Sequence, residues 1–212
     1  MITKLDHIVI SAESRQAGAD HVKAATGAEM AVGGEHKGVG THNMLCQMGE
    51  GSFVEAISRN PEAPPPDRPL WFGLHALQPT PWLSAFVLNT DDIDGAIAAG
   101  AKLGIDFGSP MPAQRGDLSW TFVFPKEGTS ALDGAVPYIM KWDQPDQHPS
   151  GGMKDVGLTL KSLTVETPDA DKLTALLQAI DFNDPRISVV AGDAVKRSAV
   201  LTTDDGRDVP LS

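Results

Sequence analysis

His7 and Glu55 are the two residues of the sequence whose types and surroundings best suit proton transfer. His7 lies in residues 5–11, LDHIVIS, a short run rich in β-branched residues that predicts a strand. Glu55 lies in residues 52–58, which predict another strand. An imidazole backed by a carboxylate can titrate near neutral pH and exchange a proton with a ligand. The same two groups can instead form a buried hydrogen bond that only stabilises the fold.

The alternation of side chains along a strand places further polar groups beside this pair. In the predicted strand near residues 41–48, Met44 and Cys46 suit a helix-packed side, which leaves Asn43 and Gln47 on the face of His7. Such a polar face is costly to bury unless it is hydrated or paired, so Asn43 and Gln47 are interpreted as groups that position a ligand. The residues that alternation places on the His7 face are Leu5, Val9, Asn43, Leu45, Gln47, Phe53, Glu55 and Ile57.

Arg115 and three tryptophans are the other candidates for ligand contacts. Arg115 follows a Pro-rich bend, and its guanidinium can hold a carboxylate, although a solvated loop arginine fits the sequence as well. Trp120 and Trp142, with Trp71, can line a pocket for a planar ligand or pack in the core. The histidines expected at the surface or in loops, with no assigned role, are His21, His36 and His148.

The elements that must position these residues repeat along the chain in the order β-α-β-β-β. Predicted helices near residues 13–26, 91–103 and 168–180 each follow a predicted strand, and Gly27 and Gly104 end the first two. Five prolines between Asn60 and Pro69 predict an extended connector. The predicted parts are a first βαβββ module, residues 1–60; a Pro-rich connector, 61–80; a second βαβββ module, 81–145; a linker, 146–155; and a partial third βαββ module, 156–212.

Composition limits the classes of partner. The 212 residues include 17 Lys and Arg against 28 Asp and Glu, and the net charge of −11 disfavours nucleic acids and anionic membranes. A single cysteine, Cys46, excludes an internal disulfide framework, and no apolar run is long enough for a transmembrane helix or a signal peptide. We therefore expect a cytoplasmic protein with a small-molecule ligand. The glycines form no phosphate-binding loop, and no G-x-S-x-G nucleophile motif occurs.

Several motifs resemble one protein family. Residues 5–10 (LDHIVI), 40–45 (GTHNML), 48–57 (MGEGSFVEAI) and 71–74 (WFGL), with Trp120 and residues 137–142 (PYIMKW), resemble the glyoxalase-like domain branch of the vicinal oxygen chelate superfamily. This superfamily contains glyoxalase I, bleomycin-resistance proteins and extradiol dioxygenases. The resemblance covers roughly residues 1–145 and implies an α+β fold of paired βαβββ modules whose curved sheets face each other around a cleft.

The resemblance also implies where a metal would bind. Metal-dependent members carry His, Gln or Glu ligands on the first and fourth strands of each module, and His7 and Glu55 match these positions in the first module. Both residue types bind Zn, Fe, Mn or Ni. In the second module, Ala85 and Met140 stand at the corresponding positions, so the chain does not assemble four ligands. A partial site would need water and a third group, His75 or His42.

Two functions follow from the resemblance. The first is an enzyme of lyase, isomerase or dioxygenase type that acts on a small oxygenated metabolite, with His7 and Glu55 as acid/base or metal pair. The second is a protein that binds and sequesters a small molecule without chemistry, as bleomycin-resistance proteins do. The sequence leaves open whether the modules pair within one chain or across a homodimer.

Overall fold

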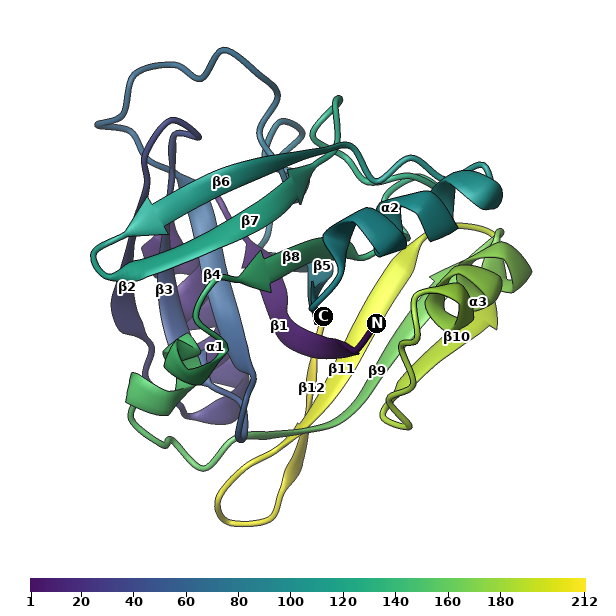
Figure 1. Ribbon diagram of the computed structural model, residues 1–212. Coiled ribbons are helices and arrows are strands. Elements are labelled where there is room, and N and C mark those ends of the chain that lie inside the picture. Colours follow the sequence, from purple (N-terminus) through teal and green to yellow (C-terminus); the bar gives the residue numbers. More distant parts are fainter.

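Two β-α-β-β-β units join edge to edge in one eight-stranded sheet, and a third unit packs on its outer face (Figure 1). The computed structural model describes residues 1–212 apart from the side chain of Pro145. The first unit contains β1 (Thr3–Ser11), α1 (Arg15–Thr26), β2 (Ala31–His36), β3 (Thr41–Gln47) and β4 (Phe53–Arg59). The second contains β5 (Trp82–Thr90), α2 (Ile93–Lys102), β6 (Ser109–Arg115), β7 (Leu118–Phe124) and β8 (Tyr138–Trp142). The 3-10 helices η1 (Pro145–Gln147) and η2 (Pro149–Gly152) lead to β9 (Thr159–Thr167), α3 (Ala170–Ala179), β10 (Ile187–Ala191), β11 (Lys196–Thr202) and β12 (Asp208–Leu211).

The pairing of β1 with β5 joins the two halves of the sheet, whose strand order is β2-β3-β4-β1-β5-β8-β7-β6. These two strands run antiparallel from Thr3 opposite Thr90 to Ser11 opposite Trp82. In each half the first strand also pairs in parallel with the last, β1 with β4 and β5 with β8. The predicted α+β fold of paired βαβββ modules is thus confirmed, and the modules pair within one chain.

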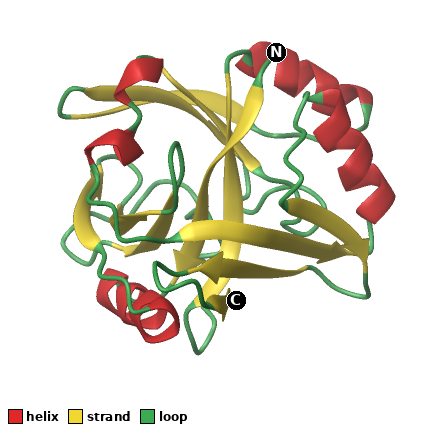
Figure 2. Ribbon diagram, turned by 90° about the horizontal axis from the view of Figure 1, so that it is seen from below, coloured by secondary structure: helices red, strands yellow, loops and turns green.

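The helices begin and end close to where the sequence predicts them. Ser14 caps α1 by accepting a hydrogen bond from the Ala17 amide, and Gly27 ends the helix in the left-handed conformation, with φ of 78°. Asp92 caps α2 by accepting a hydrogen bond from the Gly95 amide. The helices lie at the periphery and the strands cross the middle of the molecule (Figure 2). No helix among the described residues is long and apolar enough to cross a membrane.

The sequence predicts a Pro-rich bend before Arg115, but these residues form the strand β6. Pro110 and Pro112 lie inside β6, which forms one edge of the sheet and pairs only with β7. An edge strand needs ladder hydrogen bonds on one side only, and residues two apart direct their nitrogens to the same side. Both prolines therefore fit β6 with their nitrogens toward the free edge.

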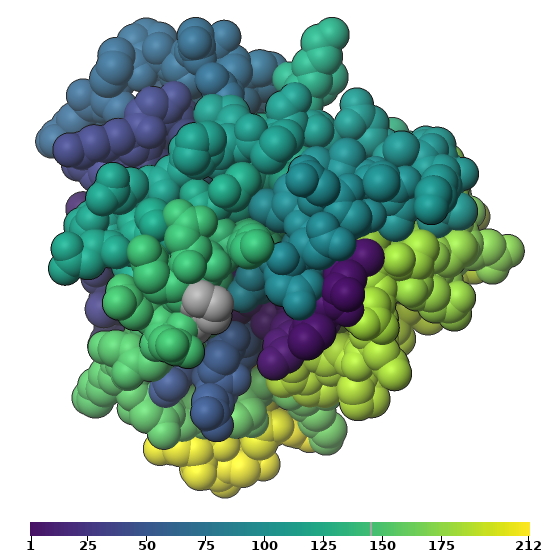
Figure 3. All heavy atoms as spheres, viewed as in Figure 1, coloured from purple at the N-terminus to yellow at the C-terminus, as the bar shows by residue number. Residues whose placement is uncertain are grey.

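The third unit has one strand more than the sequence predicts, β12, and its strand order differs from that of the first half of the large sheet. Its sheet runs β10-β9-β11-β12, so β9 lies between β10 and β11, whereas β1 in the first half has β4 as its partner within the unit. The four-stranded sheet and α3 share one apolar core with α1, α2 and the outer face of the large sheet. Figure 3 shows the yellow-green third unit packed against the purple N-terminal strand.

The Pro-rich connector inserts aromatic side chains into the inner face of the large sheet. Trp71 stacks on Phe72 at 4.8 Å and on Phe124 at 4.6 Å between ring centroids. Phe72 has a φ of 53°, which is rare for a bulky residue, and three hydrogen bonds hold this conformation. The Phe72 amide donates to Tyr138 Oη (3.1 Å), Tyr138 Oη donates to the Gly128 carbonyl (2.7 Å), and Ser11 Oγ donates to the Phe72 carbonyl (2.8 Å).

Replacement of Tyr138 by Phe tests this anchor. The Tyr138→Phe variant leaves the buried Phe72 amide without its acceptor, and we expect the free energy of unfolding to fall by about 1–3 kcal/mol. Chemical denaturation measures the change. Ser188→Ala removes a hydroxyl from the exposed Ser188–Thr164 pair and should change stability by no more than about 0.5 kcal/mol. Equal effects of the two substitutions would contradict the anchoring role of Tyr138.

Candidate functional site

The His7 imidazole lies between two buried carboxylates on the inner face of the large sheet. Its Nδ1 is 2.7 Å from Asp6 Oδ1, and its Nε2 is 3.4 Å from Glu55 Oε2. The ring stacks on Phe53, with 4.5 Å between centroids. All three polar residues are at most 6% exposed. The arrangement can hold a proton on the imidazole and keep the ring in one orientation.

A β-bulge places Asp6 on the same side of the sheet as His7. The β1–β5 pairing runs from Leu5 opposite Leu88 to His7 opposite Val87 and skips Asp6. Simple alternation puts Leu5 on the face of His7, and this prediction is wrong: Leu5 belongs to the core on the helix side. The extra residue in the bulge shifts the alternation by one position. Asp6 was absent from the predicted site for this reason.

The second oxygen of Asp6 binds residues from the end of β8 and the following linker. Trp142 Nε1 donates a hydrogen bond to Asp6 Oδ2 (2.8 Å), and His148 Nε2 is 3.1 Å from the same oxygen. His148, expected at the surface without a role, thus contacts the site, because the linker folds over it through η1 and η2. Trp142 lines a cavity, as the sequence predicts, and its indole N–H also binds the buried Asp6 carboxylate.

Glu55 binds Asn43 and lies near a second histidine. Asn43 Nδ2 donates a hydrogen bond to Glu55 Oε1 (2.6 Å), and Asn43 Oδ1 accepts one from the Gly34 amide (2.8 Å). His36 Nε2 is 4.0 Å from Glu55 Oε1, and His36 Nδ1 is 2.8 Å from Thr41 Oγ1. The expectation that His36 is a surface residue is wrong, because β2 folds back onto β3 and directs this ring inward.

The charges of the cluster follow from burial and hydrogen bonding. Burial lowers the pKa of His7, but the hydrogen bonds and charges of Asp6 and Glu55 outweigh it and raise the pKa to about 9. Burial raises the pKa values of Asp6 and Glu55, yet the histidines and Asn43 hold both below their ordinary values. Burial lowers the pKa of His36 to about 4. The cluster at neutral pH is therefore an imidazolium between two carboxylates, with a neutral imidazole beside Glu55.

The remaining predicted residues divide into two groups. Arg115 and Trp120 line a small cavity with His7 and Glu55, and Trp120 lies 5.3 Å from Trp142 between ring centroids. Gln47 does not join this cluster, because its Nε2 donates to the Ser150 carbonyl (3.1 Å) and so holds the linker. The two histidines considered as a third metal ligand lie elsewhere: His42 contacts Ser58 and His75 contacts Leu70.

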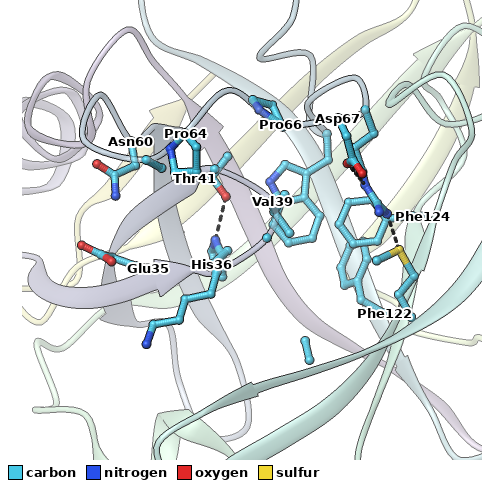
Figure 4. Close-up of a pocket in the computed structure, with 18 of the residues that line it drawn as sticks. Glu35, His36, Val39, Thr41, Asn60, Pro64, Pro66, Asp67, Phe122 and Phe124 are labelled. Carbon is cyan, nitrogen blue, oxygen red and sulfur yellow. Dashed lines mark hydrogen bonds and ion pairs between the residues drawn. The ribbon is translucent and has the colours of Figure 1, made fainter.

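Two cavities meet at the inner face. The small one, of about 40 Å³, contains the polar cluster. The large one, of about 790 Å³, lies between the β2–β3 hairpin, the connector and the β6–β7 hairpin (Figure 4). Four residues line both cavities, so a ligand in the large cavity reaches the edge of the polar cluster. These shared residues are His36, Trp71, Trp120 and Phe122.

Trp71 carries an unusual donor. Its indole Nε1 is buried and has no hydrogen-bond partner among the described residues, although Trp71 lines both cavities. Buried indole N–H groups normally have an acceptor, because an unsatisfied donor costs the free energy of its lost hydration. An oxygen atom of a bound ligand would satisfy it.

The residues of the cluster do not fit a divalent metal centre. Both ring nitrogens of His7 already face carboxylates, Nδ1 toward Asp6 and Nε2 toward Glu55. The expectation that Ala85 corresponds to His7 is wrong, because Val87 lies opposite Tyr138 as His7 lies opposite Phe53. Met140 corresponds to Glu55, as the sequence predicts, and neither Val87 nor Met140 offers a ligand for a hard divalent metal. Among the described residues, no group of three or more His, Cys, Asp or Glu is arranged to hold a metal ion.

A family model and one solved structure support the fold. The sequence model of a family described as "Glyoxalase-like domain" matches residues 5–180. The crystal structure of a hypothetical protein from Staphylococcus aureus has a TM-score of 0.61 and 13% identity, over 92% of this chain and 88% of that one. A Streptomyces coelicolor methylmalonyl-CoA epimerase variant in complex with 2-nitronate-propionyl-CoA has a TM-score of 0.43 and 16% identity, over 67% and 94% of the two chains. No curated protein matches the sequence.

Replacement of His7 by Gln tests the charge of the cluster. The folded-state pKa of His7 lies above the ordinary 6.5, so its proton stabilises the fold fully below about pH 6.5 and this contribution is lost as the pH rises through about 9. We expect the difference in unfolding free energy between wild type and His7→Gln to shrink between pH 7 and pH 10, by on the order of 1.4 kcal/mol per unit of pKa shift.

Denaturation curves at several pH values measure this difference. His21→Gln is the matched control, because His21 Nε2 makes an exposed contact of 3.2 Å with the Ser212 backbone oxygen and forms no ion pair with an Asp or Glu side chain of the described residues. The decrease in the stability difference between pH 7 and pH 10 should be specific to the comparison of wild type with His7→Gln. A constant difference for His7→Gln would show that His7 is neutral in the folded state.

Proposed function

The chain belongs to the glyoxalase-like domain family, and from this premise we propose that it binds a small oxygenated molecule with an apolar, ring-bearing body in the 790 Å³ cavity. The family match extends beyond the residues that carry the sequence resemblance and into the third unit. The single observation that carries the proposal is the buried Trp71 indole N–H, which lacks an acceptor among the described residues. A carbonyl, hydroxyl or carboxylate oxygen of the ligand would accept its hydrogen bond.

The walls of the cavity suit the body of such a ligand. Pro64, Pro66 and Val39 lie on one side, and Phe122 and Phe124 on the other (Figure 4). Aromatic and proline side chains offer flat apolar surfaces that bury a ring without polar cost. The apolar lining and the few convergent polar groups are the usual composition of a small-molecule site.

The polar end of the ligand would lie toward His36. Its imidazole is neutral at physiological pH, since its pKa is lowered to about 4 by burial, and its edge packs against Trp71 with 5.2 Å between ring centroids. Arg115, half-buried beside the small cavity, supplies a positive charge for a carboxylate. These groups explain why an oxygenated ligand is favoured over a hydrocarbon.

A second candidate function is proton transfer next to a carbonyl, as in a lyase or isomerase. The ionised Glu55 and the protonated His7 both line the small cavity, 3.4 Å apart. Glu55 would accept a proton from the carbon next to the carbonyl and return one to it, while His7 would keep the Glu55 carboxylate in place. Asn43 would hold Glu55, Arg115 would clamp a substrate carboxylate, and Trp120 and Trp142 would form the walls. The lowered pKa of Glu55 weakens it as a base, which is why binding is the first proposal.

Replacement of Trp71 by Phe tests the binding proposal. A panel of small phenols, aromatic ketones and aromatic acids is screened by ligand-observed NMR, and dissociation constants are measured for the compounds that bind. The Trp71→Phe variant keeps an aromatic ring and removes only the N–H and part of the surface. We expect its dissociation constants to rise by about five- to one-hundred-fold, the effect of one buried hydrogen bond.

Trp82→Phe is the matched control, because Trp82 lines neither of these two cavities. Its dissociation constants should equal those of the wild type. Equal affinities for Trp71→Phe and wild type, or a panel without any bound compound, would refute the proposal.

Replacement of Glu55 by Gln tests the catalytic candidate. In D2O, the wild type should accelerate hydrogen–deuterium exchange at the carbon next to the carbonyl of a small ketone or 2-oxo acid, followed by NMR. We expect Glu55→Gln to reduce this exchange by about one-hundred-fold or more, as for loss of a general base. Glu35→Gln, at the exposed rim of the large cavity, should leave it unchanged. Exchange that survives in the His7→Ala/Glu55→Ala double variant would exclude this role.

The cytoplasmic location stays a prediction from the sequence, and the sequence leaves open whether the chain forms a homodimer.

A further inference from the structure

A third cavity, of about 610 Å³, lies where the C-terminal unit meets the second half of the sheet. Its walls come from segments far apart in the sequence: the connector, the start of β5, the loop 129–134 and the start of β11. Phe72 lines this cavity on one side and the small cavity on the other. The third cavity is therefore separate from the proposed binding site and shares one aromatic wall with it.

Arg197 is the unusual residue of this cavity. It lies at the start of β11, and its Nε is buried and has no hydrogen-bond partner among the described residues. One terminal nitrogen of the guanidinium donates to the Gly134 carbonyl. No carboxylate of the described residues lies within 4.0 Å of this guanidinium, although Asp133 also lines the cavity.

A partly buried guanidinium whose Nε is buried and that has no counter-ion is costly. Moving a charge out of water is compensated only when an opposite charge or several hydrogen bonds replace the hydration. Arg186 shows the usual solution, because its Nη2 lies 2.6 Å from Asp184 Oδ2. Burial lowers the pKa of Arg197 to about 10, which leaves the side chain charged at neutral pH. An oxyanion in the cavity would supply the missing partner.

Other donors line the same cavity. Lys196 precedes Arg197 in the chain; its side chain is 69% exposed, and its Nζ lies 3.5 Å from Glu166 Oε1. Thr129 Oγ1 lies 3.3 Å from His75 Nε2, and both groups line the cavity. Cationic and hydroxyl donors that line one cavity match the oxygens of a carboxylate or a phosphate.

We propose that the cavity between the C-terminal unit and the second half of the sheet binds a small molecule through an oxyanion, which Arg197 holds with its unpaired Nε–H. The proposal does not rest on the function proposed for the aromatic cavity.

The experiment uses inorganic phosphate and succinate as probes, each added to the full chain at constant ionic strength maintained with NaCl. Thermal melting measures binding, since a ligand of the native state raises the melting temperature. We expect a saturable rise with at least one probe, and the arm that responds identifies the oxyanion as phosphate or carboxylate. In Arg197→Gln the apparent dissociation constant should rise at least tenfold. Arg186→Gln, the matched control at a paired surface arginine, should respond like the wild type.

A second measurement does not depend on the stability of the variant. Backbone amide NMR shifts of the wild type, recorded during the same titrations, should change first at residues 129–134 and 195–197. No rise in melting temperature with either probe, an equal rise in Arg197→Gln, or shifts confined to other residues would each overturn the proposal.

Discussion

The antiparallel pairing of β1 with β5 is the contact on which the rest of the structure depends. It joins two β-α-β-β-β units into one sheet, and β1 and β5, the first strands of the two units, lie at the centre of that sheet. The central position gives β1 a partner on both sides, β4 and β5, and directs His7 toward the inner face where both halves meet. A bulge in this same pairing brings Asp6 beside His7. The β1–β5 pairing therefore joins the two halves of the sheet and also positions the residues of the polar cluster.

The residues of the cluster come from β1, β3, β4 and β8 and from the linker that follows β8. Asn43 on β3 and Glu55 on β4 hold one side of His7, and Trp142 and His148 hold Asp6 on the other. Buried charges are tolerated only when their hydrogen bonds are complete, so each of these partners is needed for the charges to remain. The cluster consequently ties the linker after β8 to the centre of the sheet, and its chemistry depends on that linker.

The connector decides what the inner face can bind. A cleft between two facing modules would be open, but Trp71 and Phe72 fill its middle, and Tyr138 and Ser11 hold them there. What remains is a small polar cavity joined to a large aromatic one, and a separate cavity behind Phe72. This division favours a ligand with a ring-bearing body and an oxygenated end. It also keeps the two proposed sites, the aromatic cavity and the cavity at Arg197, apart.

The sequence by itself determined the features that repeat locally. Period-2 alternation placed Asn43 and Glu55 on one face, and the caps at Ser14 and Gly27 bounded the first helix, because these signals depend only on neighbouring residues. The tertiary structure decided the rest. The bulge at Asp6, the inward turn of His36 and the position of His148 depend on which strands pair and in which register. Arg197 lines a cavity only because the third unit packs on the second half of the sheet. Pairing between distant segments is set by the fit of the whole core, which no short stretch of sequence contains.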